Sequence, residues 1–106
     1  MGTVFDLSEL EKYVKKRKEG EEVLEKLRLA LKEIKQSPFY DVLSEYVDKI
    51  RFVPKECPLG LRIEVSNPKT IYCDISKLKS WSFDMLCFQV THEIGHACHW
   101  VVTPPK

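Results

Sequence analysis

The residues with the clearest chemical potential lie in one short motif near the C-terminus. His92-Glu93-Ile94-Gly95-His96 follows the pattern H-E-x-x-H. On a helix, two histidines four residues apart lie on one face about 6 Å apart along the axis, and both imidazoles can bind one Zn²⁺ at about 2.0–2.1 Å. Glu93 can then reach a water molecule bound to the metal and act as the general base that accepts a proton from it. Zinc lowers the pKa of that water toward roughly 7. The motif predicts zinc-assisted hydrolysis, with His92 and His96 as ligands and Glu93 as the catalytic base.

A structural use of the same residues is the alternative, because two histidines and a glutamate can form hydrogen bonds where helices meet. Glutamate is almost never buried without a partner, and the segment around Glu93 contains no lysine or arginine. Gly95 also needs a reason, since a glycine inside a helix costs about 1 kcal/mol relative to alanine. Either another segment passes close to the backbone there, as a crossing strand would, or Gly95 makes an ordinary packing contact.

The motif must lie on a helix, and the flanking residues predict one. Ser82 is a typical N-cap, Asp84 follows in the first turn, and the prolines after Thr103 end the helix. One side of this helix collects the apolar residues Phe83, Leu86, Cys87, Val90, Ile94, Ala97 and Val101. The opposite side carries His92, His96, His99, Met85 and Phe88. The apolar side is therefore expected to pack on the core, with the histidines on the other side.

The upstream sequence predicts helices followed by a small sheet. A capping box at 8–11 starts a first helix, apolar residues at helical spacing over 23–34 indicate a second, and Ser37-Pro38 starts a short third. Short β-branched or alternating segments at 51–54, 61–65 and 70–75 predict an antiparallel sheet of about three strands. Pro54 and Pro58 indicate that the first strand lies at an edge or ends early. The expected fold class is α+β, in one domain over 1–106.

Composition limits the partners of this protein. The chain has 106 residues, of which 43% are hydrophobic and 31% charged, with a net charge of +1. One globular domain follows, without the bulk charge that attracts nucleic acid or anionic lipid. The basic run at 15–18 is interpreted as the cationic end of a helix, so no nucleic-acid partner is expected. From Trp81 onward only Asp84, Glu93 and Lys106 are charged, so the C-terminal quarter is expected to be the core.

The first residues of the chain and its cysteines indicate in which cellular compartment the protein is expected. No secretory signal precedes the first predicted helix, and no run approaches the roughly 18 apolar residues of a membrane span. A cytoplasmic protein without a transmembrane segment is expected. Cys57, Cys73, Cys87 and Cys98 form no C-x-x-C pair and are expected to be free thiols. A Cys57–Cys73 bridge stays open, because the richness in Glu and Lys resembles the composition of thermophile proteins.

With this motif on a helix of low charge, after a small sheet and a helical N-terminal half, the chain resembles the zincin metallopeptidases. More narrowly, its length and order of elements resemble the minigluzincins, compact relatives of the catalytic domains of membrane metallopeptidases. Only residues 92–96 are a specific match. The resemblance implies a zinc-dependent endopeptidase that acts on peptides or unfolded protein and aligns them on an edge strand. It carries His92 and His96 over as zinc ligands and Glu93 as general base.

The third zinc ligand is where the chain departs from the larger families. Thermolysin-like gluzincins take it, usually a Glu, from a later helix, but only ten residues follow His96 and none is acidic. In the minigluzincins the resemblance implies a histidine, and His99 remains. On an unbroken helix His99 lies about 10.5 Å along the axis from His92, so the helix would have to unwind near Ala97-Cys98. The other candidates are Cys98, Asp74, Cys73, the Lys106 carboxylate and water, with His99 then a surface residue.

A tyrosine and the C-terminal tail could also serve the activity. A phenol can donate a hydrogen bond to a tetrahedral oxyanion, and Tyr72, on the predicted strand nearest the motif, is the preferred candidate. Core packing is expected instead for Tyr40 and Tyr46. The tail from Thr103 to Lys106 could fold back along the cleft and hold the enzyme latent, as C-terminal segments do in the resembling family. A frayed terminus is the alternative.

A zinc-binding structural or regulatory module without turnover is the second hypothesis. The short chain leaves no room for a second subdomain or for a later helix that supplies a ligand, and this favours the module. A homodimer is also compatible with the sequence, since a partner chain is one source of the third ligand and of the far wall of the cleft.

Overall fold

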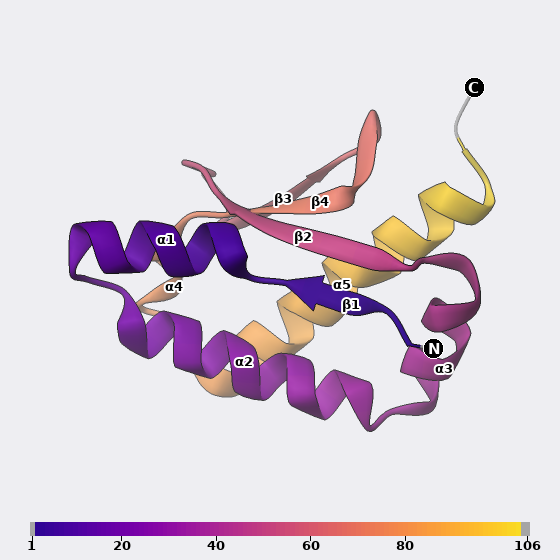
Figure 1. Cartoon of the computed structure of the whole chain (residues 1–106), viewed down its shortest axis with the longest axis horizontal. Coiled ribbons are helices and arrows are strands. Elements are labelled where there is room, and N and C mark those ends of the chain that lie inside the picture. Colours follow the sequence, from indigo (N-terminus) through magenta and orange to yellow (C-terminus); the bar gives the residue numbers. More distant parts are fainter. Residues whose placement is uncertain (1, 105–106) are drawn as a thin grey trace.

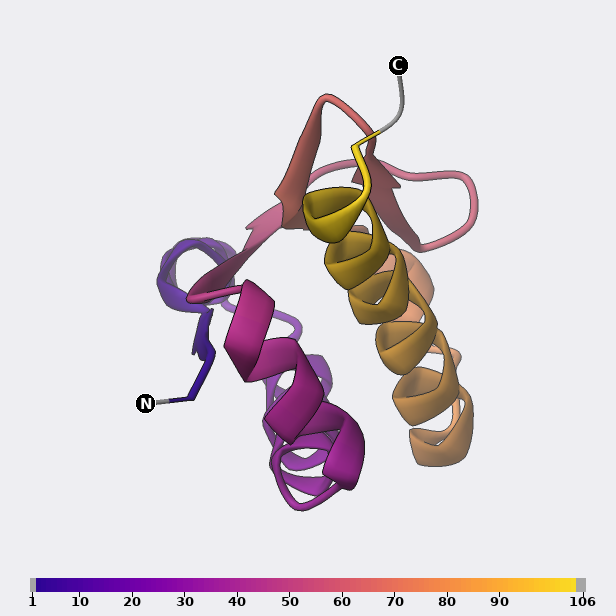
Figure 2. The same cartoon turned by 90° about the vertical axis from the view of Figure 1, so that its right-hand side faces the viewer.

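A four-stranded sheet packs against helices in the computed structural model, which describes residues 2–104 (Figure 1). In chain order the elements are β1 (Val4–Asp6), α1 (Ser8–Arg17), α2 (Glu21–Lys35), α3 (Pro38–Tyr46), β2 (Lys49–Pro54), β3 (Leu61–Glu64), β4 (Asn67–Cys73), α4 (Ile75–Leu78) and α5 (Phe83–Val102). Figure 2 shows β2, β3 and β4 above α2 and α3, in purple and magenta, while the yellow end of α5 rises to the level of these strands and β1, in indigo, lies beside α3. The α+β class predicted from the sequence is confirmed.

The sheet is mixed and differs in strand number and direction from the predicted antiparallel sheet of about three strands. Its order is β1-β2-β4-β3; β1, β2 and β4 run parallel, and β3 runs antiparallel to β4. β1 has only three residues, too few to show the alternation of a strand. β3 reverses the chain between β2 and β4, so that β4 enters the sheet beside β2 in the same direction.

β2 is an interior strand, between β1 and β4, and this corrects the expectation that its prolines place it at an edge. Pro54 is its last residue, so the other expectation, an early end, agrees with the structure. The missing N–H of Pro54 falls where the ladder ends, and the next N–H, of Lys55, donates to the Cys73 carbonyl at 3.0 Å.

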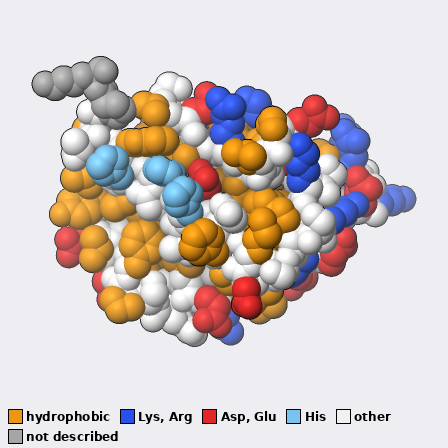
Figure 3. Space-filling model, turned by 180° about the vertical axis from the view of Figure 1, so that it is seen from behind, with side chains coloured by type: hydrophobic (Ala, Val, Ile, Leu, Met, Phe, Trp, Pro, Cys, Tyr) orange, Lys and Arg blue, Asp and Glu red, His pale blue; other side chains and the backbone are white. Residues whose placement is uncertain are grey.

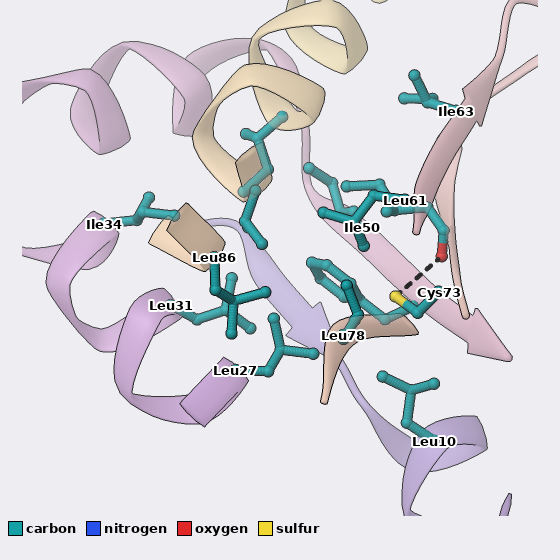
Figure 4. Packing of buried hydrophobic residues seen from close by; sticks show 14 of the residues in the cluster. Leu10, Leu27, Leu31, Ile34, Ile50, Leu61, Ile63, Cys73, Leu78 and Leu86 are labelled. Carbon is teal, nitrogen blue, oxygen red and sulfur yellow. Dashed lines mark hydrogen bonds between the residues drawn. The ribbon is translucent and has the colours of Figure 1, made fainter. Parts of the chain in front are cut away.

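The core lies between the inner face of the sheet and the helices (Figure 4). The strand residues that face it are Ile50, Phe52, Leu61, Ile63, Ile71 and Cys73. The predicted apolar side of α2 is buried through Val23, Leu24, Leu27, Ala30, Leu31 and Ile34. Burying each large apolar side chain here stabilises the fold by about 1.5–3 kcal/mol relative to leaving it exposed.

α5 carries the motif and runs without a break from Phe83 to Val102. Ser82 caps it as predicted, because its Oγ accepts a hydrogen bond from the Met85 N–H at 3.1 Å. The buried residues of α5 are Leu86, Val90, Ile94 and Ala97. The expectation that the C-terminal quarter forms the core is therefore corrected, since most core residues come from earlier elements. Within residues 2–104, neither α5 nor another helix combines the length and apolar character that crossing a membrane requires.

The ends of the first helices agree only in part with the predictions made from the sequence. The predicted capping box is replaced by Asp6, whose Oδ1 accepts from the Ser8 N–H at 3.0 Å and the Ser8 hydroxyl at 2.7 Å. Ser8 is a donor here because β1 ends at Asp6 and leaves that carboxylate next to the start of α1. The cationic end of α1 at Arg17 and the start of α3 at Pro38 after Ser37 are confirmed.

Candidate metal and catalytic site

His92 and His96 lie on successive turns of α5 with their ring nitrogens close together. Their Nε2 atoms are 3.1 Å apart, and the ring centroids are 4.5 Å apart with planes at 86°. Two imidazole nitrogens that share a tetrahedral zinc ion at about 2.0–2.1 Å lie about 3.3 Å from each other. The pair therefore fits two ligands of one zinc ion. The same 3.1 Å separation is within hydrogen-bonding distance, and the tautomers of the two rings decide which nitrogen donates.

Trp100 fixes the position of the second histidine. Its ring stacks on the His96 ring, with 5.0 Å between centroids and 20° between planes. Trp100 is itself partly buried against the core, so the stack connects His96 to the rigid part of the molecule. This contact was not predicted, although the i, i+4 spacing of His96 and Trp100 is a sequence signal for it.

Glu93 is half-buried beside the two histidines. Burial raises the pKa of its carboxyl group; the neighbouring His96 and His92 act in the opposite direction, and burial prevails. The salt bridges among residues 2–104 do not include Glu93. A carboxyl group with a raised pKa and no salt bridge is suited to accept and release a proton closer to neutral pH.

The two borders of the buried side of α5 face different elements. On one border, burial and the nearby Glu33 of α2 raise the pKa of the Cys87 thiol. Glu93 and His96 lie on the opposite border, at 100° per residue, away from Cys87, and β3 and β4 are the strands that contact α5. β3 is the last strand of the sheet, and among residues 2–104 no strand pairs with its outer side. The unpaired edge thus belongs to a strand that contacts α5, the helix that carries the motif carboxylate.

The surface around the motif is open and largely apolar. Figure 3 shows the histidines gathered among hydrophobic side chains, apart from the lysines and arginines. A shallow hollow lined by Cys87, Phe88, Thr91 and His92 adjoins them. The two polar rings of the motif therefore lie in apolar surroundings that a ligand or a partner can reach.

His99 does not join His92 and His96 within one chain. α5 stays helical through this region, so the unwinding near Ala97 that would bring His99 back to the pair does not occur. His99 is exposed instead. In the described part of the chain, no group of three or more His, Cys, Asp or Glu side chains is placed to hold a metal ion. One chain therefore brings two ligands together there.

Among residues 2–104, the other candidates for a third ligand also lie apart from the pair. Cys73 is fully buried in β4, where burial raises the pKa of its thiol and keeps it protonated. Asp74 already accepts hydrogen bonds from two neighbouring groups. Cys98 is half-buried on the border of α5 opposite Glu93. The Lys106 carboxylate lies outside the described residues. All four cysteines are free, as predicted.

Tyr72 is placed away from the histidines. Its neighbours Ile71 and Cys73 face the core, so Tyr72 points to the opposite face of the sheet. There the Lys55 Nζ lies 4.6 Å from the centroid of its ring. The structure therefore does not bring the predicted oxyanion donor to the motif.

Gly95 has open space beside it. Outside its own part of the helix, no heavy atom of residues 2–104 lies within 4 Å of the position that a Cβ would take. Neither the crossing strand nor the packing contact considered for this glycine is present among residues 2–104. The opening lies toward the side of α5 that carries His92 and His99.

The C-terminal tail follows α5 as predicted, since the helix ends at Val102. Pro105 and Lys106 lie outside the described residues, and with them the predicted contact of the tail with the cleft.

Comparisons of the chain with protein-family models, with curated proteins and with solved structures find no match.

Proposed function

We propose that the protein is a zinc-dependent endopeptidase whose metal is held by His92 and His96. The observation that carries this proposal is the 3.1 Å separation of their Nε2 atoms on adjacent turns of α5. The match of residues 92–96 to the zincin motif supports the same chemistry. When bound there, Zn²⁺ supplies Lewis acidity, which lowers the pKa of water and polarises a peptide carbonyl.

Glu93 supplies the acid–base chemistry of the proposed reaction. Its carboxylate accepts a proton from the attacking water and then delivers that proton to the leaving amine. Burial raises the pKa of the carboxyl group, which makes the carboxylate a better base and the carboxylic acid a donor closer to neutral pH. The position of Glu93 beside His92 keeps this proton transfer next to the metal ligands.

The outer edge of β3 offers a place for the substrate backbone. An extended peptide can add to an unpaired edge as a further strand, held by main-chain hydrogen bonds. At β3 such a peptide would pair with a strand that contacts α5, the helix that carries Glu93. Because this pairing engages the backbone, it suits unfolded polypeptides of varied sequence.

The test is cleavage of an unfolded protein by the zinc-loaded chain and by Glu93→Gln. The variant is expected to keep its zinc and to lose cleavage, because the amide cannot accept the proton. Asp84→Asn, which removes the other acid of α5, is the matched control and is expected to cleave like wild type. Absence of cleavage by wild type, with and without its last three residues, would contradict the proposal.

A catalytically silent zinc-binding module is the second candidate. The observation that favours it is that residues 2–104 bring only two ligands together. Zinc content does not separate the candidates, because both bind the metal. The module predicts zinc binding by wild type without cleavage, and equal behaviour of wild type and Glu93→Gln.

A further inference from the structure

The outer side of α5 is an apolar surface that the rest of the described chain does not cover. Phe88, Val102 and Met85 are 69%, 49% and 43% exposed along this side. The helix contains no lysine or arginine to keep it apart from another apolar surface. A cluster of exposed large apolar side chains of this kind marks an interaction surface.

His92, Gly95 and His99 lie along the same side in an ordered way. His92 and His99 are seven residues apart, so they lie on one side of the helix, about 10.5 Å apart along the axis. Gly95 lies midway between them, and its missing Cβ leaves open space. A glycine at this point permits the backbone of a second helix to approach closely.

We infer that two copies of the chain pair through the outer sides of their α5 helices, running antiparallel, so that the partner subunit's His99 becomes the third ligand at His92 and His96. This inference rests on the proposed function, because it assumes zinc at those two histidines. A two-fold axis near Gly95 places the partner subunit's His99 at the level of His92. Side chains on a helix lean toward its N-terminus, so in the antiparallel pair the partner subunit's His99 leans from the level of His92 toward the level of His96.

A second copy is the occupant that the site requires. One chain uses two of its three histidines and leaves the third exposed on the same surface. Under two-fold symmetry each copy gives one histidine and receives one, so a single interface completes both sites. Three histidines leave the fourth position of a tetrahedral zinc ion open, as catalytic zinc sites require. A net charge of +1 per chain adds little repulsion between the copies.

The test is complementation between two variants that are defective in different parts of the site. His99→Ala keeps the pair at His92 and His96, whereas His92→Ala/His96→Ala keeps only His99. None of the three side chains is fully buried, so both variants are expected to fold. Zn²⁺ affinity is measured by competition with a chromophoric chelator, and the dimer fraction by sedimentation equilibrium with Zn²⁺ or EDTA.

Each variant alone is expected to bind Zn²⁺ about 10-fold or more weakly than wild type, and to form fewer dimers with Zn²⁺. An equal mixture is expected to regain the wild-type affinity in one complete site per mixed dimer. A mixture as weak as its components would overturn the inference, because a ligand in the same chain cannot be restored by mixing. Wild-type affinity in His99→Ala alone would also overturn it.

Gly95→Gln provides a second variant that keeps all three histidines and places a long polar side chain at the helix crossing. It is expected to be monomeric with Zn²⁺ and to bind the metal as weakly as His99→Ala. Wild-type dimerisation and affinity in this variant would contradict the inference. These measurements do not involve peptide cleavage, so their failure leaves the proposed endopeptidase testable through Glu93→Gln.

Discussion

Glu93 and Asp74 show how the surroundings of a carboxyl group set its role. Burial opposes ionisation of both groups. Asp74 accepts hydrogen bonds from the Ser76 hydroxyl at 2.7 Å and the Cys57 N–H at 3.0 Å, and these lower its pKa in spite of burial. The pKa of Glu93 is raised, since burial there outweighs the nearby histidines. Asp74 is thus a structural carboxylate, whereas Glu93 is available for proton transfer.

Asp74→Ala is expected to lower the free energy of unfolding by about 1–3 kcal/mol, because the buried Cys57 N–H loses its acceptor. Urea unfolding at neutral pH, followed by circular dichroism, measures the effect. Ser76→Ala is the control; it removes one donor, keeps the carboxylate, and should cost only about 0.5–1.5 kcal/mol. Equal stability of Asp74→Ala and wild type would show that Asp74 does not have this structural role.

At the scale of elements, the Asp6 carboxylate connects the end of β1 to the start of α1. Hydrogen bonds from the Ser8 hydroxyl and N–H, together with Lys49 at 3.3 Å, lower the pKa of Asp6 to about 2. A carboxyl group whose pKa is depressed by folding stabilises the folded state above its ordinary pKa. That stabilisation is lost as the pH falls from about 4 toward 2, where Asp6 becomes protonated in both states.

We therefore expect wild type to be more stable than Asp6→Asn at neutral pH, and the difference to shrink as the pH falls through this window. Urea unfolding of both proteins at a series of pH values measures the difference. Ser8→Ala, which removes one donor to the carboxylate, should show a smaller effect in the same window. A difference that stays constant down to the lowest pH would contradict the role of ionised Asp6.

The fold of the single chain does not require a glycine at position 95 of α5. Gly95→Ala is expected to raise the free energy of unfolding of the zinc-free monomer by about 0.5–1 kcal/mol, since the methyl group enters open space. Gly60→Ala is the contrasting variant, because Gly60 has φ +90° and its Cβ would meet the Trp81 ring at 2.6 Å. Thermal unfolding in EDTA at low protein concentration measures both. Destabilisation by Gly95→Ala would show that the space is filled in solution.

At the scale of the whole molecule, folding brings the two zinc ligands together. The folded chain holds the Nε2 atoms of His92 and His96 3.1 Å apart, whereas the unfolded chain does not hold them in place. Zn²⁺ at 100 times its Kd is therefore expected to stabilise the fold by about 2.7 kcal/mol. Thermal unfolding with Zn²⁺, and again after EDTA, measures this shift.

Two controls test whether the zinc-dependent shift in unfolding temperature comes from His92 and His96: a different metal ion, and a variant without these histidines. Mg²⁺ prefers oxygen ligands and should leave the unfolding temperature unchanged. His92→Ala/His96→Ala should unfold at the same temperature with and without Zn²⁺. A zinc-dependent shift that survives in this variant would place the metal elsewhere on the chain.

Features that lie within one helix could be predicted from the sequence. The Ser82 cap, the buried side of α2 and the shared side of His92 and His96 all depend on contacts between residues a few positions apart. A helix repeats every 3.6 residues whatever surrounds it, so spacing alone indicates which side chains meet. The capping box at 8–11 is the local exception, because a strand ending at Asp6 changed the hydrogen-bonding partner of Ser8.

The sequence by itself therefore determined the motif, the helix that carries it and the α+β class. The tertiary structure alone decided the sheet order, the face on which Tyr72 lies, and the exposure of the outer side of α5. Strand pairing joins Val4 to Lys49 and Arg51 to Thr70 through backbone groups that nearly every residue offers, so residue types do not specify the partner. Which side of α5 stays open depends in turn on where that sheet and α2 pack against it, and only the folded chain establishes this.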